Sequence, residues 1–337
     1  MQVRHPVRSI VNLVVRKDPV EAQLIVTRRC NLSCGYCTEY DKVSEMIPLD
    51  TLKARIDALH RLRVINISLL GGEPLMHPEL PAVVAYADRK AQVSLTTNGF
   101  LITADLIRDL NRAGLANMEV SIDSVLPDRT AYIQKCLKTI RPKLALLREL
   151  AAFDVHVNLV LCEQTKGHFR ETVHELLALG FRVSIDLLHD GHGMIAIKGD
   201  DYVRLWQDYY KDAAAFSYVE EKYGTELLRG HKPAWHCRAG GRFIYVDEFG
   251  NVQLCSAQRG KLGKPVLEYT SADLRAQGSA HKECEAGCAL LCHFRGSAID
   301  NDPVGSITSL VKMIVRKPKI IAPKPPIATR PIPVQVM

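Results

Sequence analysis

The alternation of short apolar strands with amphipathic helices constrains this 337-residue chain more than any other feature. Residues typical of strands occur in six runs, at residues 22–27, 64–70, 92–97, 117–123, 155–161 and 182–188. Helical periodicity fills the intervals between them, at about residues 51–63, 78–90, 104–113, 136–152 and 168–179. Strand and helix repeated in this order predict a parallel sheet that is covered by crossover helices.

Each of the six strands carries its polar residues on one face only. In the fourth, Asn117, Glu119, Ser121 and Asp123 alternate with apolar residues, whereas buried parallel strands are usually apolar on both faces. A closed eight-stranded barrel fills its interior with bulky side chains. We therefore predict an α/β fold with a partial (β/α)6 TIM-like barrel, whose polar inner face, including Glu119 and Asp186, surrounds a polar ligand. An open doubly wound sheet is the alternative.

Beyond the sixth strand the pattern changes, and it predicts several further units. Residues 242–255 read as a hairpin with its turn at 249–251. The predicted units are an N-terminal extension (1–20), the barrel (21–195), a helical connector (196–234), a small cysteine-rich domain (235–300), and an amphipathic segment with a Pro/Lys-rich, disordered tail (301–337).

Charge and hydropathy exclude some classes of protein. No run approaches the roughly 20 apolar residues of a membrane span, and the chain does not start like a secretory signal, so we expect a cytoplasmic protein. Of the net charge of +7, the five basic residues after position 315 supply +5 and leave about +2, so nucleic acid binding is not indicated. Basic amphipathic segments at 8–17 and 307–319 suggest weak peripheral membrane contact, or packing on their own domain.

Ten cysteines are present, and eight of them fall into two groups. Cys136 and Cys162 stand apart, and we expect them simply to be buried. Cys30, Cys34 and Cys37 follow the first strand, at the ligand-binding end of parallel β/α folds. A structural zinc site needs four ligands, whereas a four-iron cluster held by three thiolates keeps one iron open. Arg28 and Arg29, just before this loop, are expected to be a solvated pair.

The run C-N-L-S-C-G-Y-C resembles the C-x3-C-x2-C loop of the radical S-adenosylmethionine (SAM) superfamily. The resemblance implies a [4Fe-4S] cluster on Cys30, Cys34 and Cys37 whose open iron binds SAM. The reduced cluster then cleaves SAM to a 5′-deoxyadenosyl radical, which abstracts hydrogen from the substrate. It also implies an electron donor such as flavodoxin or ferredoxin.

Further motifs end the next strands and are similar to motifs of the same family. Gly71-Gly72-Glu73-Pro74 resembles the G-G-E-P motif, which holds the methionine amino group, and Thr97-Asn98-Gly99 resembles T-N-G. Ser121 and Asp123 resemble the ribose-contacting S-x-D. Tyr36 fills the aromatic position near the adenine, and Asn158 occupies a place that often contacts the nucleoside.

The second cysteine group resembles the opening of the SPASM and twitch domains found in this superfamily. Cys237, Gly250 and Cys255 match that opening, whereas the C-x3-C-x3-C spacing of Cys284, Cys288 and Cys292 departs from the SPASM pattern. We expect one auxiliary [4Fe-4S] cluster on Cys237, Cys255 and two of the last three cysteines, a choice that spacing leaves open. A cluster with an open iron that meets substrate, or a zinc knot, are the alternatives.

Taken together, the resemblance predicts a radical SAM enzyme that oxidises, crosslinks or rearranges an unidentified substrate. A peptide maturase and an enzyme that modifies a small molecule or lipid both remain open, although only about 20 residues precede the first strand, which weakens the peptide case. An activating enzyme for glycyl radicals and a non-catalytic iron–sulfur or zinc protein are the rivals. The former lacks support because its ferredoxin-like cysteine runs are absent.

Overall fold

The computed structural model describes residues 17–37, 39–127, 134–212, 218–306 and 308. The amphipathic segment at 307–319 and the Pro/Lys-rich tail therefore lie outside the described residues, except for residue 308. The N-terminal amphipathic segment up to residue 16, and with it most of the expected extension, also lies outside the described residues.

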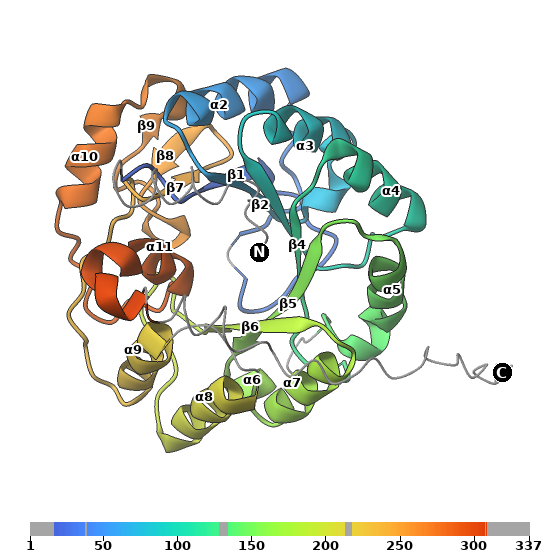
Figure 1. Ribbon diagram of the computed structural model, residues 1–337, viewed down its shortest axis with the longest axis vertical. Coiled ribbons are helices and arrows are strands. Elements are labelled where there is room, and N and C mark those ends of the chain that lie inside the picture. Colours follow the sequence, from blue (N-terminus) through green and yellow to red (C-terminus); the bar gives the residue numbers. More distant parts are fainter. Residues whose placement is uncertain (1–16, 38, 128–133, 213–217, 307, 309–337) are drawn as a thin grey trace, which may run out of the picture.

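Six parallel strands and their crossover helices build the first part of the chain (Figure 1). The strands are β1 (Glu21–Thr27), β2 (Asn66–Gly71), β3 (Gln92–Thr97), β4 (Asn117–Ser121), β5 (Asp154–Leu161) and β6 (Arg182–Leu187). The helices are α2 (Leu49–Arg61), η2 (Pro74–Met76), α3 (Leu80–Asp88), α4 (Ala104–Ala113), α5 (Leu137–Leu150), α6 (Glu163–Lys166) and α7 (Phe169–Ala178). The predicted strands and long helices are confirmed to within a few residues at each end.

The later part of the chain continues the same sheet. Its elements are α8 (Asp200–Asp212), α9 (Tyr218–Leu228), β7 (Phe243–Val246), β8 (Asn251–Gln253), η3 (Ser256–Gln258), β9 (Lys264–Pro265), η4 (Val266–Glu268), α10 (Ser271–Ser279) and α11 (Leu291–Asn301). Strand β7 pairs parallel with β1, and β8 and β9 follow antiparallel, so the strand order is β6-β5-β4-β3-β2-β1-β7-β8-β9. The predicted hairpin is thus confirmed. The domain boundaries at 195, 234 and 300 stay a prediction.

The sheet curves into a partial barrel, as Figure 1 shows, with helices outside and the strands around an interior. Residues of β1 illustrate the division: Ala22, Leu24 and Val26 are fully buried and belong to the main hydrophobic core, whereas Gln23 is only half-buried. One polar and one apolar face per strand therefore correspond to the inside and the helix-covered outside of an open barrel. The predicted partial barrel is confirmed, and the doubly wound alternative is wrong.

Cys136 and Cys162 are fully buried, as predicted. Cys136 is the residue before α5 rather than part of that helix. Among the described residues, no helix combines the length and the apolar character that crossing a membrane requires.

Gly71 shows how tightly β1 and β2 meet at the end where the motifs lie. Its φ is +145°, and a Cβ at this position would lie 1.9 Å from the carbonyl oxygen of Thr27. We expect Gly71→Ala to reduce the free energy of unfolding by about 3 kcal/mol or more, because backbone must move. Gly180 is the control: its φ is +83° and nothing lies within 4 Å of its Cβ position, so alanine should cost only about 1–2 kcal/mol. Chemical denaturation of both variants checks this, and equal costs would contradict it.

Candidate functional site

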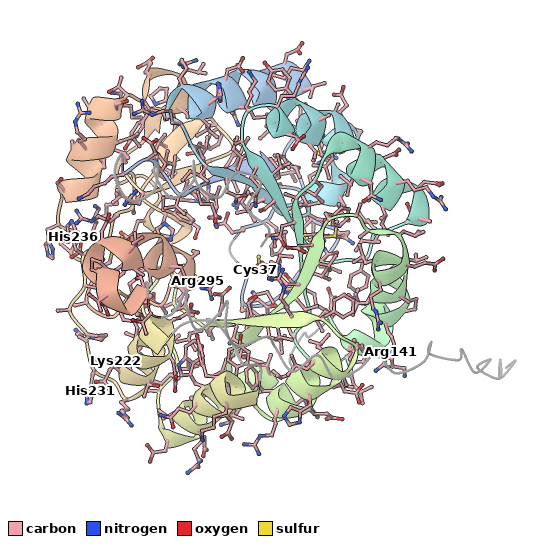
Figure 2. The ribbon with its side chains drawn as sticks, in the orientation of Figure 1. Cys37, Arg141, Lys222, His231, His236 and Arg295 are labelled. Atoms are coloured by element: carbon pink, nitrogen blue, oxygen red, sulfur yellow. The ribbon has the colours of Figure 1, made fainter. Side chains whose placement is uncertain are left out.

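The loop with Cys30, Cys34 and Cys37 leaves β1 at the end of the barrel where the other motifs gather. The amide of Cys37 donates to the carbonyl of Cys34 at 3.1 Å, which closes a turn between the last two cysteines. Lys42 Nζ donates to the carbonyl oxygens of Cys30 and Leu32 at 2.6 and 2.7 Å. A lysine that the sequence did not single out thus holds the loop in shape. In Figure 2, Cys37 lies inside the ring of strands.

The three thiols of this loop lie within electrostatic reach of one another. Burial raises the pKa of all three, and it raises the pKa of Cys34 to about 11 against a weaker opposing effect of Lys135. The Cys30 and Cys37 thiols add to the increase at Cys34 because like charges repel. Ionising all three thiols therefore requires a strong positive charge between them. A metal or iron–sulfur cluster supplies that charge, since the thiolate is the ligand form of cysteine.

Glu73 is completely buried and serves as an acceptor for three donors. Its carboxylate receives the amide of Leu75 at 2.9 Å, the hydroxyl of Thr97 at 2.7 Å and the amide of Asn98 at 2.7 Å. Burial raises the pKa of Glu73, and these hydrogen bonds lower it in part. The carboxylate thereby ties the G-G-E-P motif to the T-N-G motif across two neighbouring strands.

Asn98 extends this connection to the cysteine loop. Its side-chain amide donates to Asn31 Oδ1 at 2.7 Å and lies 3.8 Å from Cys30 Sγ. Gly72 allows the close approach, because its amide donates to the carbonyl of Thr27 at 2.9 Å and a Cβ would lie 2.4 Å or less from the carbonyl oxygens of Arg28 and Arg29. The three motifs therefore form one hydrogen-bonded unit.

Asp123 lies two residues beyond the end of β4 and contacts the cysteine loop through Tyr36. Its Oδ2 accepts from the hydroxyl of Tyr36 and lies 3.3 Å from Lys135 Nζ. Its Oδ1 is buried and has no hydrogen-bond partner. Lys135 Nζ also lies 5.1 Å from the centre of the Tyr36 ring. A buried carboxylate oxygen without a donor costs free energy, so this atom fits a hydroxyl group of a ligand.

Two other predicted SAM contacts lie nearby in the sheet. Ser121, at the end of β4, is paired in register with Asn158 of β5. Asn158 donates to Asp186 Oδ2 at 3.0 Å and accepts from the hydroxyl of Ser184 at 2.9 Å. Thr97, Asn98, Ser121 and Asp123 thus lie at the ends of β3 and β4, Asn158 lies within β5 beside Ser121, and their contacts with SAM stay a prediction.

In the second cysteine group, four thiols lie near one another. The pKa of Cys288 is raised by burial first and then by Cys237, Cys255 and Cys284. Burial raises the pKa of Cys237 to about 11 and that of Cys255 to about 12, and each of these thiols also responds to Cys284. Four thiols within electrostatic reach of one another, three of them buried and that of Cys284 half-buried, match the ligand set of a four-iron cluster.

Cys292 differs from the other four. It lies in α11, and after burial the main influences on its pKa are Asp186, Glu21 and Arg295, all groups of the barrel interior. Only Cys255 of the second group appears among its main influences, and its thiol lies 3.3 Å from His293 Nδ1. Cys292 nevertheless packs against the small cluster of Cys255, Cys288 and Leu290, so what sets it apart is its electrostatic surroundings.

The inner face of the barrel carries a polar network. His156 Nε2 lies 2.9 Å from Glu119 Oε2, and Thr96 reaches the same carboxylate at 3.5 Å. Arg295 of α11 donates to both oxygens of Glu220 at 2.9 and 2.7 Å and lies 3.7 Å from Asp186 Oδ1. In Figure 2, Arg295 lies inside the ring like Cys37. Carboxylates thus dominate this interior.

Glu21 belongs to this interior and was outside the predicted first strand, which began one residue later. Burial and then the nearby Glu119 raise its pKa from 4.5 to about 7, against a smaller opposite effect of Arg295. In the unfolded chain the carboxyl ionises near 4.5, so the folded protein binds this proton more tightly. Its contribution to stability is complete below pH 4.5 and is lost as the pH rises through 7.

We therefore expect the free energy of unfolding of Glu21→Gln to fall less than that of the wild type as the pH rises from 5 to 8. Relative to the wild type, the variant should gain about 2 kcal/mol in free energy of unfolding between pH 5 and pH 8, after discounting for partial solvent screening. Denaturation at both pH values measures this. Glu149, exposed on α5, supplies the control Glu149→Gln, and an equal pH response of all three proteins would refute the assignment.

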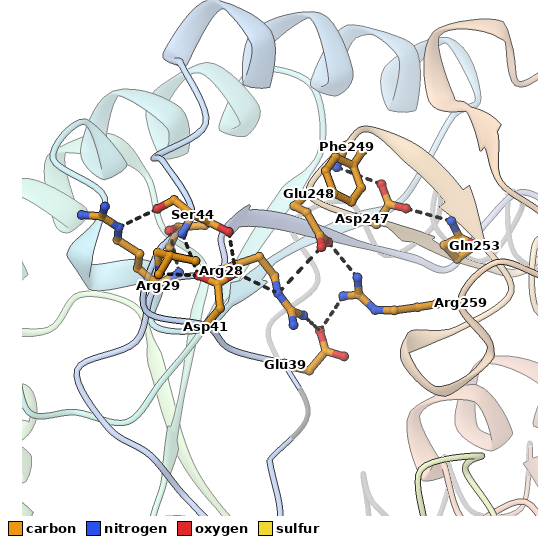
Figure 3. A network of polar contacts seen from close by, with 12 residues as sticks. Arg28, Arg29, Glu39, Asp41, Ser44, Asp247, Glu248, Phe249, Gln253 and Arg259 are labelled. Atoms are coloured by element: carbon orange, nitrogen blue, oxygen red, sulfur yellow. Dashed lines mark hydrogen bonds and ion pairs between the residues drawn. The ribbon is translucent and has the colours of Figure 1, made fainter.

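The prediction that Arg28 and Arg29 form a solvated pair is wrong. The Arg28 side chain is only 12% exposed and lies 3.3 Å from Glu39 Oε2 and 3.8 Å from Glu248 Oε1. Arg29 Nε donates to the carbonyl of Ser44 at 2.5 Å. Figure 3 shows that Arg259 binds the same two carboxylates, at 3.1 and 2.8 Å. Segments 220 residues apart meet here, which local sequence cannot reveal.

This ionic cluster joins the two cysteine-bearing parts of the chain. Glu39 follows Cys37 by two residues, and Arg259 follows Cys255 by four. Lys135, Lys42, Glu39, Arg259, Glu21 and Arg295 are the site residues that sequence reasoning missed. A lysine or arginine in a loop has no signal that separates it from a solvated one, since its partner is distant in sequence.

Comparisons with known proteins agree with this geometry. Residues 24–187 match the Radical SAM superfamily. The GTP 3′,8-cyclase of Syntrophomonas wolfei is 32% identical over 149 residues, which are 41% of this chain and 45% of that protein. The probable GTP 3′,8-cyclase of Aeropyrum pernix is 31% identical over 184 residues, 50% of this chain and 51% of that protein. The chain thus matches about half the length of these relatives.

Solved structures resemble the fold over more of the chain. Streptococcus suis SuiB bound to the precursor peptide SuiA matches with a TM-score of 0.62 at 16% identity, covering 86% of this chain and 74% of that one. Native anSMEcpe with bound AdoMet and Cp18Cys peptide matches with a TM-score of 0.55 at 15% identity, covering 87% and 96%. At these identities the likeness is one of fold. Residues 24–187, with the cysteine loop and the ordered motifs at the strand ends of the partial barrel, therefore carry a radical SAM domain.

Proposed function

We propose that this enzyme binds a [4Fe-4S] cluster through Cys30, Cys34 and Cys37 and binds SAM beside it. The buried, unpartnered Oδ1 of Asp123 carries the proposal, because it lies at the cysteine loop and requires a donor such as a ribose hydroxyl. The cluster, once reduced by one electron from a donor protein, would supply with SAM the radical chemistry that removes a hydrogen atom from the substrate. The donor set fits, since three clustered thiols, with no fourth in their loop among the residues that the structure describes, would leave one iron for SAM.

The chain's own residues would orient SAM. Gly71, Gly72, Glu73 and Pro74 would hold the methionine amino group, while Ser121 and Asp123 would contact the ribose. Asn158 would contact the nucleoside, with Tyr36 near the adenine. Lys135 adds a buried cation: burial lowers its pKa, but Asp123 and the Cys34 thiol raise it by more, so it stays charged. An ammonium at this position can receive a ligand carboxylate.

For the auxiliary site we propose one [4Fe-4S] cluster on Cys237, Cys255, Cys284 and Cys288. The mutual electrostatic influence of these four thiols supports this set. Cys292 is then the remaining cysteine, with its main polar neighbours in the barrel interior. A full set of four thiolates favours a role in accepting an electron, over direct binding of substrate to an open iron.

The substrate is best argued from the charge of the barrel interior. Glu21, Glu119 and Asp186 line it, and Arg295 is already bound to Glu220 through two hydrogen bonds. A nucleoside triphosphate, such as the GTP in the names of the matched relatives, would meet carboxylates here. A neutral or cationic substrate fits better, and a peptide is our first choice because two proteins of the same fold were solved with peptides. A small molecule or lipid is the alternative, and a flavodoxin or ferredoxin would supply the electron.

The test is the formation of 5′-deoxyadenosine from SAM under anaerobic conditions with dithionite. We expect product from the reconstituted wild type and at least roughly tenfold weaker SAM binding by Asp123→Asn. Asp105→Asn is the matched control, because Asp105 is 91% exposed in a surface ion pair with Arg108. Absence of any SAM cleavage by an iron-loaded wild type would reject the proposal and favour a non-catalytic iron–sulfur protein.

A further inference from the structure

Three potential metal ligands meet on the outer surface, away from the barrel interior. They are His236, His281 and Glu285, whose ligand atoms all lie within 4.8 Å of one another. His236 Nδ1 lies 3.2 Å from Glu285 Oε1, and His281 Nδ1 lies 3.0 Å from Glu285 Oε2. Figure 2 shows His236 at the outer edge of the molecule, in contrast to Cys37 and Arg295 inside the ring. Neither cysteine group includes these three side chains.

Glu285 is held in place by the backbone around it. Its side chain is only 6% exposed, and its Oε1 accepts from the amides of Cys237 and Lys282 at 3.0 and 3.1 Å. The carboxylate is therefore fixed before any ion arrives, which reduces the entropy lost on binding. His281, by contrast, is 77% exposed and can adjust to an ion.

The orientation of the His236 ring also favours a cation at this position. Its Nε2 lies 3.1 Å from the carbonyl oxygen of Gly278, so that nitrogen carries a hydrogen and donates it. In the neutral ring the lone pair is then on Nδ1 and faces the Glu285 carboxylate. A lone pair and a carboxylate oxygen repel unless a proton or a cation lies between them. Metal-binding histidines commonly donate their other ring N–H to a carbonyl in this way.

Nearby cations do not occupy this position. Lys282 directs its ammonium to the carbonyl oxygens of Cys237, Gln277 and Ala280. Arg238 donates to the carbonyl of Gly278 at 2.7 Å and lies 3.6 Å from Asp300. Both positive charges are thus engaged with other acceptors.

We propose that His236, His281 and Glu285 bind a divalent transition-metal ion such as zinc. Two imidazole nitrogens and a carboxylate suit zinc, with a fourth position open to water. The ion would connect the segment before β7 with the turn before α11. His236 precedes Cys237 and Glu285 follows Cys284, so the ion would brace two of the cysteines of the second group from outside.

The experiment is a zinc titration of the full chain after anaerobic iron–sulfur reconstitution, when the cysteines are occupied by iron. A fluorescent zinc indicator measures free zinc, and iron per chain is measured before and after. The variant is His281→Ala. Because the His281 side chain is exposed, its loss should leave the fold intact, so weaker zinc binding would report on the ligand itself. The matched control is His231→Ala, because His231 is 62% exposed and pairs with Glu226 at 2.7 Å, outside any three-ligand group found among the described residues.

We expect the wild type and His231→Ala to bind one zinc per chain with iron unchanged, and His281→Ala to bind it at least roughly tenfold more weakly. Three results would overturn the proposal. They are no saturable binding by the wild type, equal binding by His281→Ala, and zinc uptake matched by iron loss, which would place the zinc on the cysteines.

Discussion

Replacing Cys30, Cys34 and Cys37 together by alanine is expected to remove about four iron atoms per chain and to leave about four. The remaining iron would be that of the cluster proposed for the second cysteine group, which the substitution does not touch. SAM cleavage should fall below about a thousandth of the wild-type rate, because the group that delivers the electron is lost. Iron and sulfide analysis after anaerobic reconstitution, combined with assay of 5′-deoxyadenosine, measures both effects.

Cys136→Ala is the control for this experiment. Its thiol is fully buried and contacts Thr139 Oγ1 at 3.1 Å, so its loss should weaken packing and leave iron unchanged. If the triple variant retained all its iron, the three-cysteine loop would not be a cluster site. If the wild type held about four iron atoms and the variant none, the auxiliary cluster would be rejected instead. Zinc in place of iron in both proteins would contradict the enzyme mechanism altogether.

Single replacement of Cys237, Cys255, Cys284 or Cys288 by alanine is expected to remove the other four iron atoms, about half of the total. Cys292→Ala should keep the full iron content, because Asp186, Glu21 and Arg295 influence its thiol more than any other cysteine does, although Cys292 also packs against Cys255 and Cys288. Iron per chain and the electron paramagnetic resonance signal of the reduced clusters compare the five variants. Loss of iron from Cys292→Ala together with its retention in Cys284→Ala or Cys288→Ala would reverse the assignment.

Much of the fold was predictable from the sequence because it depends on local patterns. The six parallel strands and the helices between them follow from hydrophobic periodicity, which a barrel needs to separate its inner face from its helix-covered outside. The first strand illustrates the limit. The predicted strand began one residue after Glu21, whose carboxyl lies in the interior with a raised pKa.

In the candidate site, too, local motifs were recognisable from the sequence, whereas contacts between distant residues were not. Cys30, Glu73, Thr97 and Asp123 were found because each belongs to a short motif at a strand end, and parallel strands bring their ends together. Lys135 was missed because a lysine next to a helix has no local mark of burial. Arg28 was misjudged because its partners Glu39 and Glu248 come from different parts of the chain.

The sequence by itself determined which motif follows which strand, the loop with three thiols and the polar inner face of the barrel. Spacing and periodicity are properties of neighbouring residues, so these features need no tertiary information. Tertiary structure alone brings Cys284 and Cys288 within electrostatic reach of Cys237 and Cys255, lets Arg259 and Arg28 share two carboxylates, and brings His236, His281 and Glu285 together. These pairings depend on where β7 joins β1 and where α11 packs. Contacts of that kind are set by the whole fold, because electrostatic and hydrogen-bond partners need proximity in space and not in sequence.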